Sequence, residues 1–64
     1  MGQVFTSAEL IRMIEADGWR QVAAKGSHWQ FVHPTKPGRV TVPHPRREVA
    51  KGTAASILRQ AGLK

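Results

Sequence analysis

The spacing of apolar residues changes at Trp19 from a helical to a strand-like period, and this change restricts the chain to a mixed α and β fold. Before Trp19, Leu10, Met13 and Ile14 recur at intervals of three and four residues, which is the spacing along one face of a helix. After Trp19, residues 28–33 alternate between two faces, as a β-strand does. A chain of 64 residues has room for one small core, so we expect a single domain covering residues 1–64.

Local start and stop signals predict the first helix from about Ser7 to Asp17. Thr6 and Glu9 have the spacing of a capping box, in which each side chain accepts a hydrogen bond from an otherwise unpaired amide. Gly18 supplies the left-handed residue that commonly ends a helix.

Three strands are expected next, over residues 20–24, 28–33 and 39–42, with turns at 25–27 and 34–38. Pro43 ends the third strand because proline cannot donate to a sheet ladder. In the second strand Trp29, Phe31 and His33 share one face, while His28 and its alternating neighbours share the other. Trp29 and Phe31 serve either as core or as a base-stacking pair, and core packing is the favoured interpretation because few other large residues are available.

A basic loop from Pro45 to Lys51 is expected to precede a second helix, capped by Thr53 and ended by Gly62. Both helices must cover one face of the three-stranded antiparallel sheet, because neither can otherwise bury its apolar stripe. The predicted fold class is therefore α+β with the order α-β-β-β-α, which is the topology of double-stranded-RNA-binding domains.

The charge of the chain points to an acidic partner. Ten Lys and Arg residues stand against four Asp and Glu residues, which gives a formal net charge of +6. A domain this basic is suited to binding a polyanion or an acidic protein, although solvated surface charge is the alternative.

No segment approaches the roughly 20 apolar residues of a membrane span, so no membrane partner is expected. The myristoylation-like pattern of Met1–Thr6 is interpreted as chance, because its last residues better explain the start of a helix.

No metal site or cofactor is expected. The chain has no cysteine. Its histidines, His28, His33 and His44, do not have the spacing of a zinc finger or zincin.

His28 is the candidate for chemistry. From the residues alone it is either a polar residue at the start of a strand or a proton-transfer group, since imidazole titrates near neutral pH. Lys25 and the amides of Gly26 and Ser27 can contact a phosphate, although Gly26 and Ser27 also fit a plain hairpin turn. A second set of cations is predicted to contact phosphates or a protein partner, with plain surface charge as the alternative: Arg46, Arg47 and Lys51.

Four stretches, in this order, resemble the HicA toxins of bacterial and archaeal toxin–antitoxin pairs: Gly26-Ser27-His28, 40–43, 51–53 and 56–63. The resemblance implies a cytoplasmic, metal-independent mRNA endonuclease on a double-stranded-RNA-binding-like fold. It also implies a HicB-type antitoxin that binds the toxin and covers its active site, so that the toxin is a monomer alone and part of a hetero-oligomer with its antitoxin. The histidine that the family requires maps onto His28, and no role is transferred to His44. The alternatives are a non-catalytic RNA-binding module and an adaptor for an acidic protein.

Overall fold

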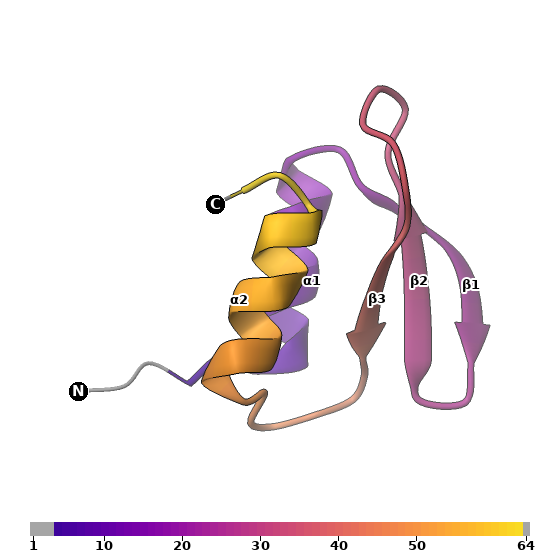
Figure 1. Cartoon of the computed structure of the whole chain (residues 1–64). Helices are drawn as coiled ribbons and strands as arrows, with labels where there is room; N and C mark the ends of the chain where they lie inside the picture. The colour runs from indigo at the N-terminus through magenta and orange to yellow at the C-terminus, as the bar shows by residue number, and fades with distance from the viewer. Residues whose placement is uncertain (1–3, 64) are drawn as a thin grey trace.

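Two helices cover one face of a three-stranded antiparallel sheet in the computed structural model, which describes residues 4–63 (Figure 1). The elements in chain order are α1 (Ser7–Ala16), β1 (Arg20–Lys25), β2 (His28–Val32), β3 (Val40–Pro43) and α2 (Lys51–Gln60). The strand order is β1-β2-β3, with β2 in the centre. The predicted α+β class and α-β-β-β-α order are confirmed. The Met1–Thr6 pattern begins with residues that lie outside the described part of the chain.

The ends of α1 follow the predicted signals. The Thr6 hydroxyl accepts a hydrogen bond from the Glu9 amide at 3.1 Å, and the Glu9 carboxylate accepts one from the Thr6 amide at 2.8 Å. At the other end Gly18 has a φ of 111°, and the Trp19 amide donates to the Ile14 carbonyl at 3.1 Å. The helix itself ends at Ala16, one residue before the predicted end, with Asp17 as its C-cap.

The inner face of the sheet, turned toward the helices, carries most of the core. Phe31, Val40 and Val42 are fully buried, and Trp29 packs against the same cluster while partly exposed. The core interpretation of Trp29 and Phe31 is therefore confirmed. Met13 was expected in the inner stripe of α1, but its side chain is 39% exposed. The buried face of the helix instead runs through Ser7 and residues 10, 11 and 14.

Four strand ends differ from the prediction: β1 continues to Lys25, β2 ends at Val32, and β3 runs from Val40 to Pro43. Pro43 lies inside β3 and pairs with His28. Proline has no amide donor, but β3 is an edge strand, so no further strand requires a hydrogen bond from this residue. His33 lies beyond β2, since its ring accepts hydrogen bonds from the amides of Thr35 and Lys36 in the following turn.

The prediction for the start of α2 was wrong. Thr53 lies inside the helix, and the N-cap is Ala50, whose side chain makes no capping hydrogen bond. The cause is Val49, which is 2% exposed and whose amide donates to the Phe5 carbonyl at 2.8 Å. This β-bridge holds the chain just before Lys51, so the helix begins there rather than at the side-chain signal.

The C-terminal end of α2 is as predicted. Gly62 has a φ of 73°, and the Leu63 amide donates to the Leu58 carbonyl at 2.8 Å. Leu63 then packs on the core, which is the hydrophobic contact that often accompanies such a cap.

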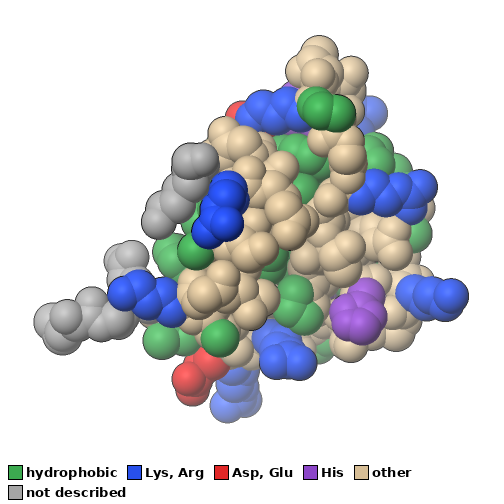
Figure 2. Space-filling model, in the orientation of Figure 1, with side chains coloured by type: hydrophobic (Ala, Val, Ile, Leu, Met, Phe, Trp, Pro, Cys, Tyr) green, Lys and Arg blue, Asp and Glu red, His purple; other side chains and the backbone are tan. Residues whose placement is uncertain are grey.

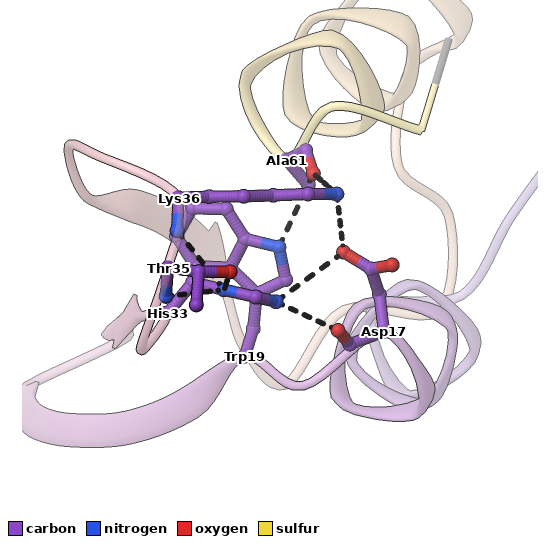
Figure 3. Close-up of polar contacts among 6 residues, drawn as sticks. All are labelled: Asp17, Trp19, His33, Thr35, Lys36 and Ala61. Atoms are coloured by element: carbon purple, nitrogen blue, oxygen red, sulfur yellow. Dashed lines mark hydrogen bonds and ion pairs between the residues drawn. The ribbon is translucent and has the colours of Figure 1, made fainter.

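A polar network joins the C-terminal ends of both helices to the β2–β3 turn (Figure 3). The Trp19 indole donates to the Ala61 carbonyl at 3.2 Å, and the Lys36 ammonium donates to the same carbonyl at 3.1 Å. Lys36 also forms an ion pair with the Asp17 carboxylate. One lysine thus connects the end of α1 to the end of α2.

His33 completes this network. Its Nδ1 accepts from the amides of Thr35 and Lys36 at 3.0 and 3.1 Å, so the ring proton is assigned to Nε2, which donates to the Asp17 carbonyl at 2.7 Å. The ring also packs edge-on against Trp19, with centroids 5.3 Å apart. The sequence analysis placed His33 on the face of Phe31 and did not anticipate these contacts.

The two threonines provide a matched test of capping. We expect Thr6→Ala to lower the free energy of unfolding by about 1 kcal/mol, because the capping box is lost. Thr53→Ala should change it by less than about 0.5 kcal/mol, because the exposed Thr53 caps nothing. Urea denaturation of both variants measures the difference. Equal losses would show that the observed helix starts are wrong.

The Asp17 carboxylate makes the stability depend on pH. The hydrogen bond from Lys36 lowers the pKa of Asp17 below its ordinary value of 3.8; partial desolvation opposes this shift, and the charges of Lys36 and His33 add to it. A lowered carboxyl pKa stabilises the fold above the ordinary value, and this stability is lost as the pH falls through the lower, folded-state pKa.

We therefore expect the melting temperature to fall on acidification below about pH 4. Asp17→Asn should be less stable at neutral pH and should lose less on acidification. Thermal unfolding followed by circular dichroism measures both effects. Glu15→Gln, at an exposed position of α1, is the control and should keep the wild-type acid response.

Candidate functional site

The β1–β2 hairpin places Lys25 and His28 directly opposite each other. Opposed residues of an antiparallel pair lie on the same face of the sheet. Only two residues connect the strands. Gly26, the first residue of this turn, has a φ of 58°, whereas Ser27, the second, does not have a positive φ. This is the pattern of a type II′ turn with glycine in the first position. The turn therefore requires Gly26 for its backbone conformation and not for lack of space. No heavy atom outside Gly26 and its two chain neighbours lies within 4 Å of the point where a Cβ of residue 26 would stand.

His28 lies on the outer face of the sheet, which we define as the face turned away from the helices. It is exposed and pairs with Pro43 of β3 on its other side. The next residue on this face of β2 is Gln30, while Trp29 and Phe31 point toward the core. The predicted alternation and the predicted exposure of His28 are confirmed.

Arg46 and Arg47 lie in the 44–50 loop, which is attached to the start of α1. Ser7 is 1% exposed, and its hydroxyl accepts from the Arg46 amide at 2.8 Å. The Ser7 amide donates to the Arg46 carbonyl at 2.9 Å. Both arginine side chains remain exposed, so the loop has a fixed backbone and solvent-accessible charges.

The same loop is joined to the hairpin turn. The His44 amide donates to the Ser27 carbonyl at 2.7 Å, which links residue 44 to the turn before His28. A pocket of about 440 Å³ lies where the loop meets the first turn of α1. Its lining consists of Thr6, Ser7, Ala8, His44, Pro45, Arg46 and Arg47.

His44 has structural contacts that could not be predicted from the sequence. Its Nδ1 lies 2.7 Å from the Ser7 hydroxyl, and its ring packs edge-on against Trp29 with centroids 4.4 Å apart. Because Trp29 belongs to the inner face, the His44 ring lies on the side of the sheet opposite to His28. The two histidines therefore do not form a pair across one site.

Four of the cations lie at the end of the molecule where the helices begin, together with Glu9 and Glu48; they are Lys25, Arg46, Arg47 and Lys51. Figure 1 shows that α1 and α2 both begin at the end where the β1–β2 turn lies. Helix N-termini carry partial positive charge, and α2 has neither an acidic residue in its first turn nor a side-chain cap. Glu9 occupies the first turn of α1. Figure 2 shows Lys and Arg side chains spread over the visible face, with few Asp or Glu and a histidine exposed among them.

The predicted site residues are thus brought together in part. Lys25, Gly26, Ser27 and His28 form one continuous hairpin. Arg46, Arg47 and Lys51 are exposed on the adjacent loop and the first turn of α2. Within residues 4–63 no hydrogen bond or ion pair joins these three cations to His28.

Two further properties of the described residues bear on the site. Residues 4–63 hold no cluster of three or more His, Cys, Asp or Glu side chains suited to a metal ion. Neither helix of this part of the chain has the length and apolar character needed to cross a membrane.

The sequence and the fold of this chain match known toxins. The family described as the HicA toxin of bacterial toxin–antitoxin systems matches residues 7–63, and the chain belongs to this family. A chain of a solved toxin–antitoxin complex from Streptococcus pneumoniae is 32% identical, with a TM-score of 0.76, over 91% of this chain and 97% of that chain. No curated protein sequence matches the chain.

Proposed function

We propose that this protein is an endoribonuclease that cleaves mRNA through His28 and acts as the toxin of a type II toxin–antitoxin system. The observation that carries the proposal is the β1–β2 hairpin, which presents His28 beside Lys25 on an exposed face in a member of the HicA family. An exposed imidazole beside a cation can reach a phosphodiester without any rearrangement of the core.

The proposed reaction uses the 2′-hydroxyl of the RNA as nucleophile. His28 accepts the 2′-hydroxyl proton as the oxygen attacks the adjacent phosphorus. The bond from phosphorus to the 5′-oxygen breaks, and the products are a 2′,3′-cyclic phosphate and a 5′-hydroxyl. The Lys25 ammonium and the Gly26 and Ser27 amides stabilise the negative charge of the pentacoordinate intermediate. The leaving oxygen takes a proton from a second donor, which is water in a site this exposed.

Binding in this proposal depends on the RNA backbone. Three exposed cations contact phosphates at the end of the molecule where both helices begin: Arg46, Arg47 and Lys51. Trp29 and Phe31 take no part, since both pack toward the core. Recognition therefore rests on charge and on polar side chains rather than on aromatic stacking.

The proposed partner is a HicB-type antitoxin, in keeping with the toxin–antitoxin complex from Streptococcus pneumoniae. The toxin alone is a monomer in the cytoplasm, and with the antitoxin it forms a hetero-oligomer. The antitoxin presents Asp and Glu side chains to Lys25, Arg46, Arg47 or Lys51 and thereby covers His28. Association through such charges is accelerated at low ionic strength and slowed by salt.

We expect His28→Ala to abolish RNA cleavage while the fold is retained. His28 is exposed, so its loss should change the free energy of unfolding by no more than about 0.5 kcal/mol. Cleavage of a labelled mRNA fragment and circular dichroism measure the two quantities. Arg12→Ala, an exposed position of α1, is the control and should cleave normally. Undiminished cleavage by folded His28→Ala protein would remove the catalytic assignment.

The products should carry a 2′,3′-cyclic phosphate or a 3′-phosphate, because the 2′-hydroxyl is the nucleophile. Activity should survive EDTA, and a DNA strand of the same sequence should remain intact. Mass spectrometry of the fragments identifies the ends. Cleavage of DNA, or a strict requirement for magnesium, would contradict this mechanism.

Antitoxin and RNA should compete for the toxin, because both require the same cations. With His28→Ala toxin and labelled single-stranded RNA, added antitoxin should displace the RNA, as measured by fluorescence anisotropy. The RNA affinity should fall with salt, with a slope of about −0.7 per phosphate contacted. A stable ternary complex on size-exclusion chromatography would show that inhibition does not work by covering the site.

A further inference from the structure

The outer face of the sheet carries a regular arrangement of polar and basic side chains beyond the hairpin. Strand pairing sets three rows across this face: Lys25, His28 and Pro43; then Ala23, Gln30 and Thr41; then Arg20 and Val32. Arg39 precedes the Val40–Phe31 pair, and its guanidinium donates to the Gln30 side-chain oxygen at 2.7 Å. The Arg39 side chain therefore reaches over the outer face, beside the second row.

This face is uncovered and free of acidic side chains. Both helices pack on the inner face, and every residue of β1 is exposed. The four acidic residues of the chain are Glu9, Glu15, Asp17 and Glu48. The first three belong to α1 or its C-cap, and Glu48 lies in the loop before α2. The charge of the outer face is thus entirely positive.

We propose that the outer face binds single-stranded RNA along a line from His28 to Arg20 and Arg39. This inference rests on the proposed function and adds the form of the substrate and its path. Successive rows on one face of a sheet are two residues apart, so the row of His28 and the row of Arg20 are separated by about 13 Å. One extended RNA strand bridges that distance within a few nucleotides. The phosphates on one side of the cut bond then contact Arg20 and Arg39.

The middle row supports a single strand over a duplex. Gln30 and Thr41 offer an amide and a hydroxyl between the two basic rows, and unpaired bases expose the edges that such groups can contact. The geometry of the proposed reaction also favours a single strand. Attack by a 2′-hydroxyl needs the 2′-oxygen, phosphorus and 5′-oxygen close to a line, and an A-form duplex holds these atoms away from that arrangement.

The first test compares two exposed arginines. The His28→Ala protein provides a non-cleaving background in which the dissociation constant for a labelled single-stranded RNA is measured at several salt concentrations. Arg39→Ala should raise this constant about tenfold and make the salt slope shallower by about 0.7, because one phosphate contact is lost. Arg59→Ala on α2, an exposed arginine on the helical side, should change the constant by less than about twofold.

A second test compares two variants that have the same net charge as each other. Thr41→Glu places a carboxylate in the middle row, whereas Gln60→Glu places the same charge at the C-terminal end of α2; both positions are exposed. Thr41→Glu should weaken RNA binding about tenfold or more, and Gln60→Glu by less than about twofold. A duplex RNA of the same length should bind the His28→Ala protein more weakly than the single strand does.

Each other outcome overturns the proposal. If Arg39→Ala and Thr41→Glu match their controls, the RNA does not lie on the outer face. If the two variants lose affinity for the antitoxin and keep it for RNA, the face is a protein interface. Tighter binding of duplex RNA would reject the single-strand assignment. A failure of the catalytic proposal is recognised separately, because it appears as RNA cleavage by the His28→Ala protein. In that case a 2′-O-methyl RNA, which has no 2′-hydroxyl to act as nucleophile, keeps the binding measurements interpretable.

Discussion

Burial of Phe31 between the sheet and the two helices determines which side of β2 faces the solvent. Phe31 is fully buried together with Val40 and Val42, and removing a side chain of this size from water contributes about 1.5–3 kcal/mol. Strand side chains alternate, so a slip of one residue would expose Phe31 and carry His28 beneath the helices. The position of the His28 imidazole therefore follows from the packing of an apolar neighbour three residues away.

The polar residues at the two ends of the molecule differ in their contacts. At the C-terminal ends of the helices, Asp17, Lys36 and His33 form a polar network around Trp19. At the other end, the backbone of the 44–50 loop is held through Ser7 while its side chains stay free. Because the stabilising contacts lie away from the hairpin, His28 can be exposed at little cost to the fold.

Features encoded by neighbouring residues could be predicted from the sequence, and features that depend on distant pairs could not. The Thr6–Glu9 capping box needs only its own segment, and the alternation around His28 needs only one strand. The start of α2, by contrast, depends on Val49 pairing with Phe5 at the opposite end of the chain. Tertiary contacts of this kind override a local capping signal such as Thr53.

The same distinction applies to the site. Lys25 and His28 are separated by a two-residue turn, so their proximity could be inferred from the hairpin pattern. The contact between Arg39 and Gln30 depends on the register of β2 with β3 across a turn whose course is set by His33. No periodicity in the sequence specifies that register. For this reason the cations beside His28 could be predicted from the sequence, whereas the reach of Arg39 over the sheet could not.

The use of aromatic residues in the core limits how the proposed ribonuclease can select RNA. Aromatic side chains on an open sheet stack on individual bases and contribute much of the affinity of RNA-binding domains for them. Here Phe31 and Trp29 pack beneath the sheet, so the middle row of the outer face offers bases the polar side chains of Gln30 and Thr41 in place of aromatic rings. Affinity on such a surface comes mainly from phosphates, and phosphate contacts carry no sequence information. Under the proposed function, a toxin of this kind acts on many messages with little discrimination among them, and its activity is then controlled by a partner that covers the cations rather than by the choice of substrate.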